Sequence, residues 1–362
     1  MRAAQTLKFI KKEVPPYVSG TMSTTAGSVF RISSDWSRAD YWGAIKSRLG
    51  AFRMNYPVSP GLYAAGEPTM GSDVVVSANY KLSFDILRRE LKGLNVWLLV
   101  LDTKGINVWC AAGKGTFSTD ELISRMSATK LGEVVDHRRI IVPQLGAVGV
   151  NAAEVQKRTG FRVFFGPVLA KDLPSYIEAG YTKTKEMSTI RFPMMERIIL
   201  TPMEINPAMK KFPWFACGVL FVFGLQPSGI LFKSALSGGM PFLALGLTSV
   251  LAGAFLTPVL LPFVPFRSFA VKGWIIGVLS MLAVMPLFGP SVQGEILLLV
   301  ASWLFFPAMS SYIALQFTGS TNFTGMSGVK KELKIGIPLY VSLAGISLVF
   351  LMVYKIREWG ML

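Results

Sequence analysis

The chain has 362 residues, 51% of them hydrophobic, and a formal net charge of +16. Its two cysteines are too few for a disulfide scaffold, and its single histidine excludes a histidine-rich metal site. The length allows two domains: residues 1–211 hold 29 Lys and Arg with 18 Asp and Glu, whereas residues 212–362 hold eight and three. The first part is therefore basic and soluble in composition, and the second has the composition of a membrane domain.

Residues 1–62 are basic, rich in Pro and Ser, and poorly periodic, and we interpret them as an N-terminal extension. The first residues contain no apolar run long enough for a secretory signal, so the soluble part is expected to stay in the cytoplasm.

Residues 63–190 predict an α/β domain, because short apolar strands alternate with amphipathic helices. In chain order we expect a strand at 73–78, a helix at 83–92, strands at 96–101 and 106–110, a helix from the capping box at 118–121 to about 130, a strand at 139–143, a helix starting near 151 and a strand at 161–165. Residues 191–211 form a linker to the membrane part.

Five windows without charged side chains follow, at 212–232, 234–266, 273–294, 296–329 and 335–354. Crossing the hydrocarbon core takes roughly 20 apolar residues, so residues 212–355 predict an all-α domain of five transmembrane helices. The excess of Lys and Arg in alternate loops places the N-terminus inside and the C-terminus outside, in a multi-pass protein of the cytoplasmic membrane. Only Tyr and Cys ionise within the windows, which favours an anchor over a permease.

The stretch "NVWCAAGKG", 107–115, carries the more informative cysteine, because Cys217 lies among Phe, Trp and Val, where a free cysteine acts as a small hydrophobic residue. We expect Cys110 at a strand end, before a glycine-rich loop and a capped helix. The stretch matches neither a phosphate-binding loop nor a dinucleotide fingerprint. Three interpretations remain: a structural thiol, a nucleophile with His137 as its base, and a thiolate that fills one position of a metal whose other ligands belong to a cofactor.

The same stretch resembles the signature of the HgcA family, the membrane-anchored corrinoid proteins of mercury methylation, at every position from Asn107 to Lys114. The segments "SANYKLSFDILRREL" and "TGSTNFTGMSGVKKEL" also resemble that family, as does the order of a soluble domain and membrane helices. The soluble domain is similar to the large subunit of the corrinoid iron–sulfur protein of acetyl-CoA synthesis. The resemblance covers nearly the whole chain after about residue 60.

The resemblance implies a Rossmann-like, mixed-sheet corrinoid-binding domain with a cap helix at 118–130. It assigns Cys110 as the catalytic residue and the lower axial ligand of the cobalt in a base-off, cobalamin-type corrinoid. Lys114 is expected near a corrin side-chain amide or phosphate. The residues expected to contact the cofactor are Asn107, Val108, Trp109, Cys110, Ala111, Ala112, Gly113, Lys114, Gly146 and Gly149, the last two near the nucleotide tail.

The implied function is methyl transfer from the corrinoid to Hg(II), producing methylmercury. A thiolate below the cobalt suits this acceptor because it donates electron density, and methyl must reach an electrophile with its electron pair. The implied partners are a ferredoxin-like iron–sulfur protein that donates electrons and carries Hg(II), a methyltetrahydrofolate-linked methyl donor, and membrane lipid, with no nucleic acid. The alternatives are a corrinoid methyl carrier with another acceptor, and a permease with a regulatory domain.

Overall fold

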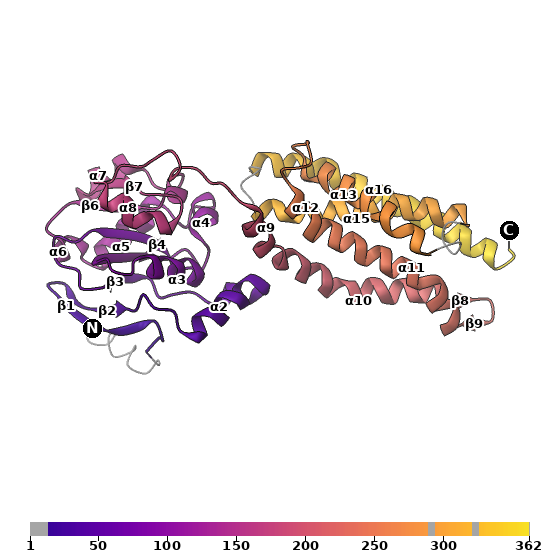
Figure 1. Cartoon of the computed structure of the whole chain (residues 1–362), viewed down its shortest axis with the longest axis horizontal. Helices are drawn as coiled ribbons and strands as arrows, with labels where there is room; N and C mark the ends of the chain where they lie inside the picture. Colours follow the sequence, from indigo (N-terminus) through magenta and orange to yellow (C-terminus); the bar gives the residue numbers. More distant parts are fainter. Residues whose placement is uncertain (1–13, 289–293, 321–325, 362) are drawn as a thin grey trace. The chain divides into compact units, whose positions relative to one another are not determined.

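The computed structural model describes residues 14–288, 294–320 and 326–361. The chain divides into two compact units, Met1–Ile190 and Arg191–Leu362. The first unit is a mixed α/β domain and the second is helical (Figure 1).

The α/β unit is built on a seven-stranded sheet with the order β1-β2-β3-β5-β4-β6-β7. Its strands are β1 (Val18–Thr24), β2 (Gly27–Ile32), β3 (Gly61–Ala65), β4 (Val74–Ala78), β5 (Val96–Leu101), β6 (Arg139–Val142) and β7 (Arg162–Phe165). The four neighbours β5, β4, β6 and β7 are all parallel, whereas β3 runs antiparallel to β5 and β1 antiparallel to β2. The mixed sheet predicted for this unit is confirmed.

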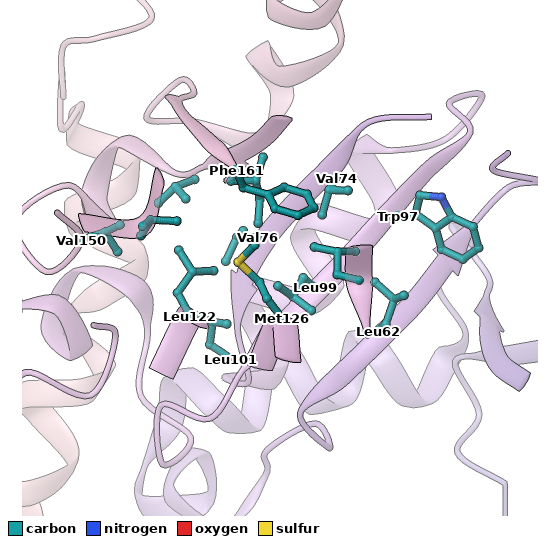
Figure 2. Packing of buried hydrophobic residues seen from close by; sticks show 14 of the residues in the cluster. Leu62, Val74, Val76, Trp97, Leu99, Leu101, Leu122, Met126, Val150 and Phe161 are labelled. Atoms are coloured by element: carbon teal, nitrogen blue, oxygen red, sulfur yellow. The ribbon is translucent and has the colours of Figure 1, made fainter. Parts of the chain in front are cut away.

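Helices cover both faces of this sheet. They are α2 (Arg38–Leu49), α3 (Lys81–Glu90), α4 (Val108–Lys114), α5 (Thr119–Ala128), α6 (Leu131–Val134), α7 (Ala152–Thr159) and α8 (Leu173–Glu178), with short 3₁₀ turns η1 (Ala51–Asn55), η2 (Gln144–Gly146) and η3 (Ala170–Asp172). Alternate residues of the strands point to opposite faces, so two cores form. Val76 and Leu99 pack with α4, α5 and α7 on one face (Figure 2), and Val75 and Leu98 pack with α3 and α8 on the other.

The segment that the sequence suggested as a separate N-terminal extension is part of the α/β unit. Strands β1 and β2 extend the sheet beyond β3, and the part before residue 14 lies outside the described residues. Strand β1 lies at the edge of the sheet, and its residues are alternately half-buried and exposed. The sequence did not predict this strand because such a pattern contains few apolar residues.

A buried cluster of four charged side chains ties this N-terminal segment to the rest of the unit. Lys81 lies 3.1 Å from Asp40 and 2.5 Å from Asp85, and Arg88 lies 2.8 Å from each of the same two carboxylates. All four residues are at most 4% exposed. Because two positive and two negative groups face one another, the charges balance without solvent.

The helical unit contains α9 (Met194–Leu200), α10 (Pro202–Gly224), a hairpin of β8 (Leu225–Gln226) and β9 (Gly229–Ile230), α11 (Phe232–Leu251), a π-helical turn η4 (Ala252–Leu256), α12 (Thr257–Leu260), α13 (Phe269–Val284), η5 (Met285–Phe288), α15 (Ile296–Gln316), η6 (Phe317–Ser320) and α16 (Met326–Glu358). The best-packed pairs are α10 with α11, α13 with α15, and α15 with α16. The helices of this bundle run lengthwise beside one another (Figure 1).

Within the described residues, four helical segments are long and apolar enough to cross a membrane, where the sequence predicted five. They are Phe232–Leu260, Phe269–Phe288, Ile296–Gln316 and Gly328–Glu358. The first predicted span falls short because its window is shared between a helix and a hairpin. Helix α10 stops at Gly224, and its uncharged part, 212–224, rises only roughly 20 Å against a core of about 30 Å.

Candidate functional site

Cys110 lies in the first turn of α4, not at the end of a strand as the sequence suggested. Asn107 is the N-cap of this helix, and its side-chain Oδ1 accepts a hydrogen bond of 2.9 Å from the Cys110 N–H. The helix ends at Gly115, whose positive φ of 78° satisfies the left-handed C-cap. The β-branched and aromatic residues of "INVW" favour a strand, but the cap and the two alanines that follow favour a helix and prevail.

Helix α4 has two chemically different faces. Val108, Ala111 and Ala112 are buried and pack in the core cluster beneath the helix. Cys110 is half-buried, and Gly113 and Lys114 are exposed. Residues 110, 113 and 114 share a face because they lie three and four positions apart. Residues 107–114 were predicted to contact a cofactor. Cys110, Gly113 and Lys114 are accessible to one, whereas Val108, Ala111 and Ala112 are buried and hold the helix in place.

Trp109 and Asn107 lead from α4 into a neighbouring cleft. The Trp109 side chain is 37% exposed and lies outside the core clusters. Both residues line a cavity of about 380 Å³, which also contacts Ser77, Pro143 and Gly166. The cleft thus adjoins the helix that bears the cysteine.

The cleft lies at the carboxyl ends of the parallel strands. The chain runs from β4 through α3 to β5 on one side, then crosses to β6 on the other side of β4. Strands β4 and β6 pair only at Val75 and Ile141, and residues further along each strand direction, Ser77 and Pro143, line the cleft. A reversal of strand order of this kind leaves a crevice where α/β proteins bind ligands.

The loop before α4 is fixed by Asn79 at the end of β4. Its buried Oδ1 accepts hydrogen bonds from the Thr103 N–H (3.0 Å), the Thr103 hydroxyl (2.8 Å) and the Gly105 N–H (3.0 Å). Asp102 accepts hydrogen bonds from Lys104, which lower the pKa of its carboxyl although partial burial acts to raise it. Sequence reasoning missed Asn79, whose only signal is a polar side chain directly after a buried strand.

Helix α5 starts where the capping sequence predicted, with Ser118 accepting from the Glu121 N–H at 3.3 Å. The Glu121 carboxylate takes a different role from the one a capping box gives it. It accepts from the Asp102 N–H at 2.8 Å and pairs with Arg125 at 2.7 Å. The same helix therefore helps to fix the loop that precedes α4.

Gly146 and Gly149 pack against the turn between α4 and α5. A Cβ at Gly146 would lie 2.5 Å from a ring carbon of Phe117, and one at Gly149 would lie 2.0 Å from the Phe117 carbonyl oxygen. The Thr119 N–H also donates to the Gly149 carbonyl at 3.1 Å. Neither glycine lines the cleft, so the structure gives both a packing role and leaves their predicted contact with a nucleotide tail untested.

His137 does not serve Cys110. Its Nδ1 accepts from the Arg139 N–H at 3.1 Å, so its Nε2 donates to the Ser72 carbonyl at 2.9 Å. It precedes the amino end of β6, whereas Cys110 follows the carboxyl end of β5, and these parallel strands put the two residues at opposite edges of the sheet. The nucleophile–base interpretation is therefore wrong.

Tyr80, the N-cap residue of α3, interacts electrostatically with Cys110, and sequence reasoning missed it. Burial raises the pKa of its phenol, Arg53 and Arg48 act to lower it, and the Cys110 thiol adds a small opposing effect. Cys217 is exposed on α10 in the other unit. Among the described residues, no cluster of three or more His, Cys, Asp and Glu side chains is placed to hold a metal ion.

Comparison with known proteins matches the α/β unit. Residues 53–177 match the family described as the CO dehydrogenase/acetyl-CoA synthase delta subunit. The matched segment runs from η1 to α8 and includes α4 and the cleft.

Curated relatives are gamma subunits of acetyl-CoA decarbonylase/synthase complexes. Those of Methanopyrus kandleri and Archaeoglobus fulgidus are 30% and 29% identical over 123 and 126 residues, which are 33% and 34% of this chain and 26% of each relative. The gamma 2 subunit of Methanosarcina thermophila is 30% identical over 128 residues, 34% of this chain and 27% of the relative. The chain spans about a quarter of the relatives' length. These matches support the resemblance of the α/β unit to proteins of acetyl-CoA synthesis and do not single out the mercury-methylation family.

Proposed function

We propose that the α/β unit binds a corrinoid and takes part in corrinoid-dependent methyl transfer, with Hg(II) as the acceptor. The observation that carries the proposal is a half-exposed cysteine on the outer face of α4, beside a cleft at the switch point of the sheet. The similarity of residues 53–177 to subunits of acetyl-CoA decarbonylase/synthase supports corrinoid chemistry in general. The Hg(II) acceptor rests on the chemistry of the thiolate and on the match from Asn107 to Lys114.

The residues of α4 fit a flat macrocycle. A Cβ added at Gly113 would meet nothing within 4 Å, so the surface beside Cys110 is open where a corrin would need room. A lone thiol fills one coordination position, which is all that a metal already held by a macrocycle requires. The cleft of about 380 Å³ suits a small-molecule portion such as the nucleotide tail, with the macrocycle on the face of α4.

Each side chain near the thiol then has a defined task. Cys110 Sγ would hold the metal, and Asn107 fixes the backbone of Cys110 through the helix cap. Trp109 forms a wall of the cleft, and Lys114 lies within reach of anionic or amide groups at the rim. When bound, a corrinoid supplies a cobalt centre that carries a methyl group and releases it to an acceptor.

The choice of sulfur favours an electrophilic acceptor. A thiolate is a strong, soft donor, so Cys110 would supply electron density to a metal that it holds, and this would favour transfer of a methyl group together with its bonding electron pair. Hg(II) is a soft electrophile and suits such a transfer. The two cysteines of the chain are too few to hold iron–sulfur clusters, so we propose a ferredoxin-like partner for electrons and Hg(II) and a methyltetrahydrofolate-linked donor for methyl.

We propose that the helical unit anchors the protein in the cytoplasmic membrane, with the α/β unit on the cytoplasmic side. The four apolar segments support a membrane location, and Lys210 and Lys211, which precede the first of them, support a cytoplasmic α/β unit.

A corrinoid methyl carrier with a different acceptor is the second candidate. The observation in its favour is that the matched relatives belong to complexes named for acetyl-CoA. Such a carrier would deliver methyl to a nucleophile, and the two functions therefore differ in the electronic character of the acceptor.

The test is an anaerobic assay of the full chain loaded with methylated corrinoid, offered either Hg(II) or a nucleophilic thiol or metal centre. We expect methylmercury from the wild type, with the yield collapsing for Cys110→Ala and staying well below wild type for Cys110→His, because a neutral imidazole donates less charge. Absorption spectra of each variant check that corrinoid is still bound. Transfer only to the nucleophile would support the second candidate and exclude the first.

A further inference from the structure

A cavity in the helical unit has no part in the chemistry of Cys110. It has a volume of about 1000 Å³ and is lined by residues of α13, α15 and α16 and of the segment that leads into α13. Helices α13 and α16 both pack extensively along α15 but hardly touch one another. The cavity is therefore a groove between α13 and α16 with α15 as its floor.

Small residues let α13 approach α15 closely, and no comparable approach joins α16 to α13. A Cβ at Gly273 of α13 would lie 2.4 Å from Ala314 Cβ, so these two helices meet at close range. The Ser310 hydroxyl donates to the Gly273 carbonyl at 2.8 Å across the same seam. Helix α16 makes no comparable approach to α13, which leaves the groove.

The walls of the groove are apolar and its floor is satisfied internally. Phe266 and Trp274 on one side and Leu339 on the other are each about half exposed. On the floor, the Ser311 hydroxyl donates to the Ala270 carbonyl at 2.6 Å and so accepts from the Tyr340 hydroxyl at 2.7 Å. Because these polar groups already have hydrogen-bond partners, the groove is suited to an apolar ligand along its length.

One end of the groove is basic. Arg267, at the start of α13, and Lys331, in the first turns of α16, both line it with exposed side chains. Lys330 and Lys334 flank Lys331 on α16. Among the described residues neither Arg267 nor Lys331 pairs with an acidic side chain. The end therefore offers uncompensated positive charge.

The one carboxylate in the groove is already engaged. Glu332 accepts hydrogen bonds of 2.9 Å from the Ser268 hydroxyl and from the Ala270 N–H, at the amino end of α13. The helix terminus is thus neutralised by the protein itself, and an incoming anion would meet Arg267 and Lys331 instead.

We infer that this groove binds an anionic phospholipid, with its acyl chains along the apolar walls and its phosphate between Arg267 and Lys331. Basic pockets between membrane helices are suited to acidic headgroups, and each basic residue near the surface contributes about a fivefold gain in affinity. Charge complementarity at one end and apolar walls along the rest match an anionic lipid better than a neutral one. The inference does not depend on what the α/β unit transfers.

The test uses the purified full chain in detergent, titrated with phosphatidylglycerol or phosphatidylcholine and followed by native mass spectrometry. Wild-type protein is expected to prefer phosphatidylglycerol, and the double variant Arg267→Gln/Lys331→Gln is expected to bind it roughly 30-fold more weakly. Lys233→Gln is the matched control, because Lys233 is an exposed basic residue at the start of α11 that does not line the groove. Arg267→Lys/Lys331→Arg keeps both charges and should keep the preference.

Equal binding of the two lipids to wild-type protein would overturn the inference. So would a preference that survives in the Gln double variant, or one that Lys233→Gln loses to the same extent. Glycerol 3-phosphate, the headgroup portion without acyl chains, is expected to compete weakly. If it displaced phosphatidylglycerol at equal concentration, the site would bind free phosphate esters and the lipid assignment would be wrong.

Discussion

Asn107 fixes the geometry around the cysteine through a single hydrogen bond. Its side chain caps α4 and holds the Cys110 N–H, so the thiol projects from the first turn of a helix. The sequence identified the stretch and its cysteine but assigned a strand to it. The evidence for a helix was present in the spacing of Val108, Ala111 and Ala112, which bury one face, and in the glycine C-cap.

Gly113 provides a test in which stability and binding respond in opposite directions. Gly113→Ala adds a methyl group that meets nothing within 4 Å, and alanine in a helix is favoured over glycine by up to about 1 kcal/mol. The thermal unfolding temperature of the full chain should therefore be unchanged or slightly raised. If a macrocycle lies on this face, the corrinoid dissociation constant should rise, as measured by absorption titration.

Gly149→Ala is the comparison for Gly113→Ala. Gly149→Ala puts a Cβ 2.0 Å from the Phe117 carbonyl oxygen, so it should lower stability and binding together. Unchanged corrinoid affinity in Gly113→Ala would mean that the cofactor does not lie on the outer face of α4.

At the scale of elements, the strands of the parallel part follow from the sequence more directly than the edges do. "VWLLVL" at 96–101 is apolar throughout because both faces of β5 are buried, and its bounds match the prediction. Strand β1 was not predicted, because its residues are alternately half-buried and exposed and give little apolar signal. It pairs with β2 at the edge of the sheet. The cleft could not be predicted from the sequence either, because it depends on how β4 and β6 pair, and these strands come from distant segments of the chain.

The buried cluster predicts a large cost for removing one charge. Arg88→Met leaves Asp40 and Asp85 facing only Lys81, and breaking a buried pair costs about 3–5 kcal/mol. Hydrogen exchange in the full chain should show faster opening of α2 and α3. Arg89→Met is the control, since the Arg89 side chain is 47% exposed, and exposed pairs contribute about 0–1 kcal/mol. Equal effects of the two changes would contradict a structural role for the cluster.

For the whole molecule, the division into a basic and an apolar half follows from charge counts alone, and the structure divides at residue 190. The number of spans does not follow so simply. Helix α10 packs along α11 although its amino-terminal part carries Glu204, Lys210 and Lys211. Hydropathy measures how much a segment prefers lipid, whereas packing against a neighbour also decides where a helix lies.

The topology is testable with a reporter fused after Leu362. The four apolar segments put the two ends of the helical unit on the same side of the membrane, because their number is even. With a cytoplasmic α/β unit, the C-terminal reporter should then read cytoplasmic. A periplasmic reading would mean that a fifth segment also crosses, as the sequence predicted.

We propose that Cys110 Sγ ligates the cobalt of a bound corrinoid. The direct measurement is cobalt X-ray absorption of the corrinoid-loaded full chain, for wild type, Cys110→Ala and Cys217→Ala. We expect a cobalt–sulfur scattering shell in the wild type and in Cys217→Ala, and its loss in Cys110→Ala with corrinoid still bound. A wild-type spectrum without sulfur at cobalt, or a sulfur shell that persists in Cys110→Ala, would contradict it.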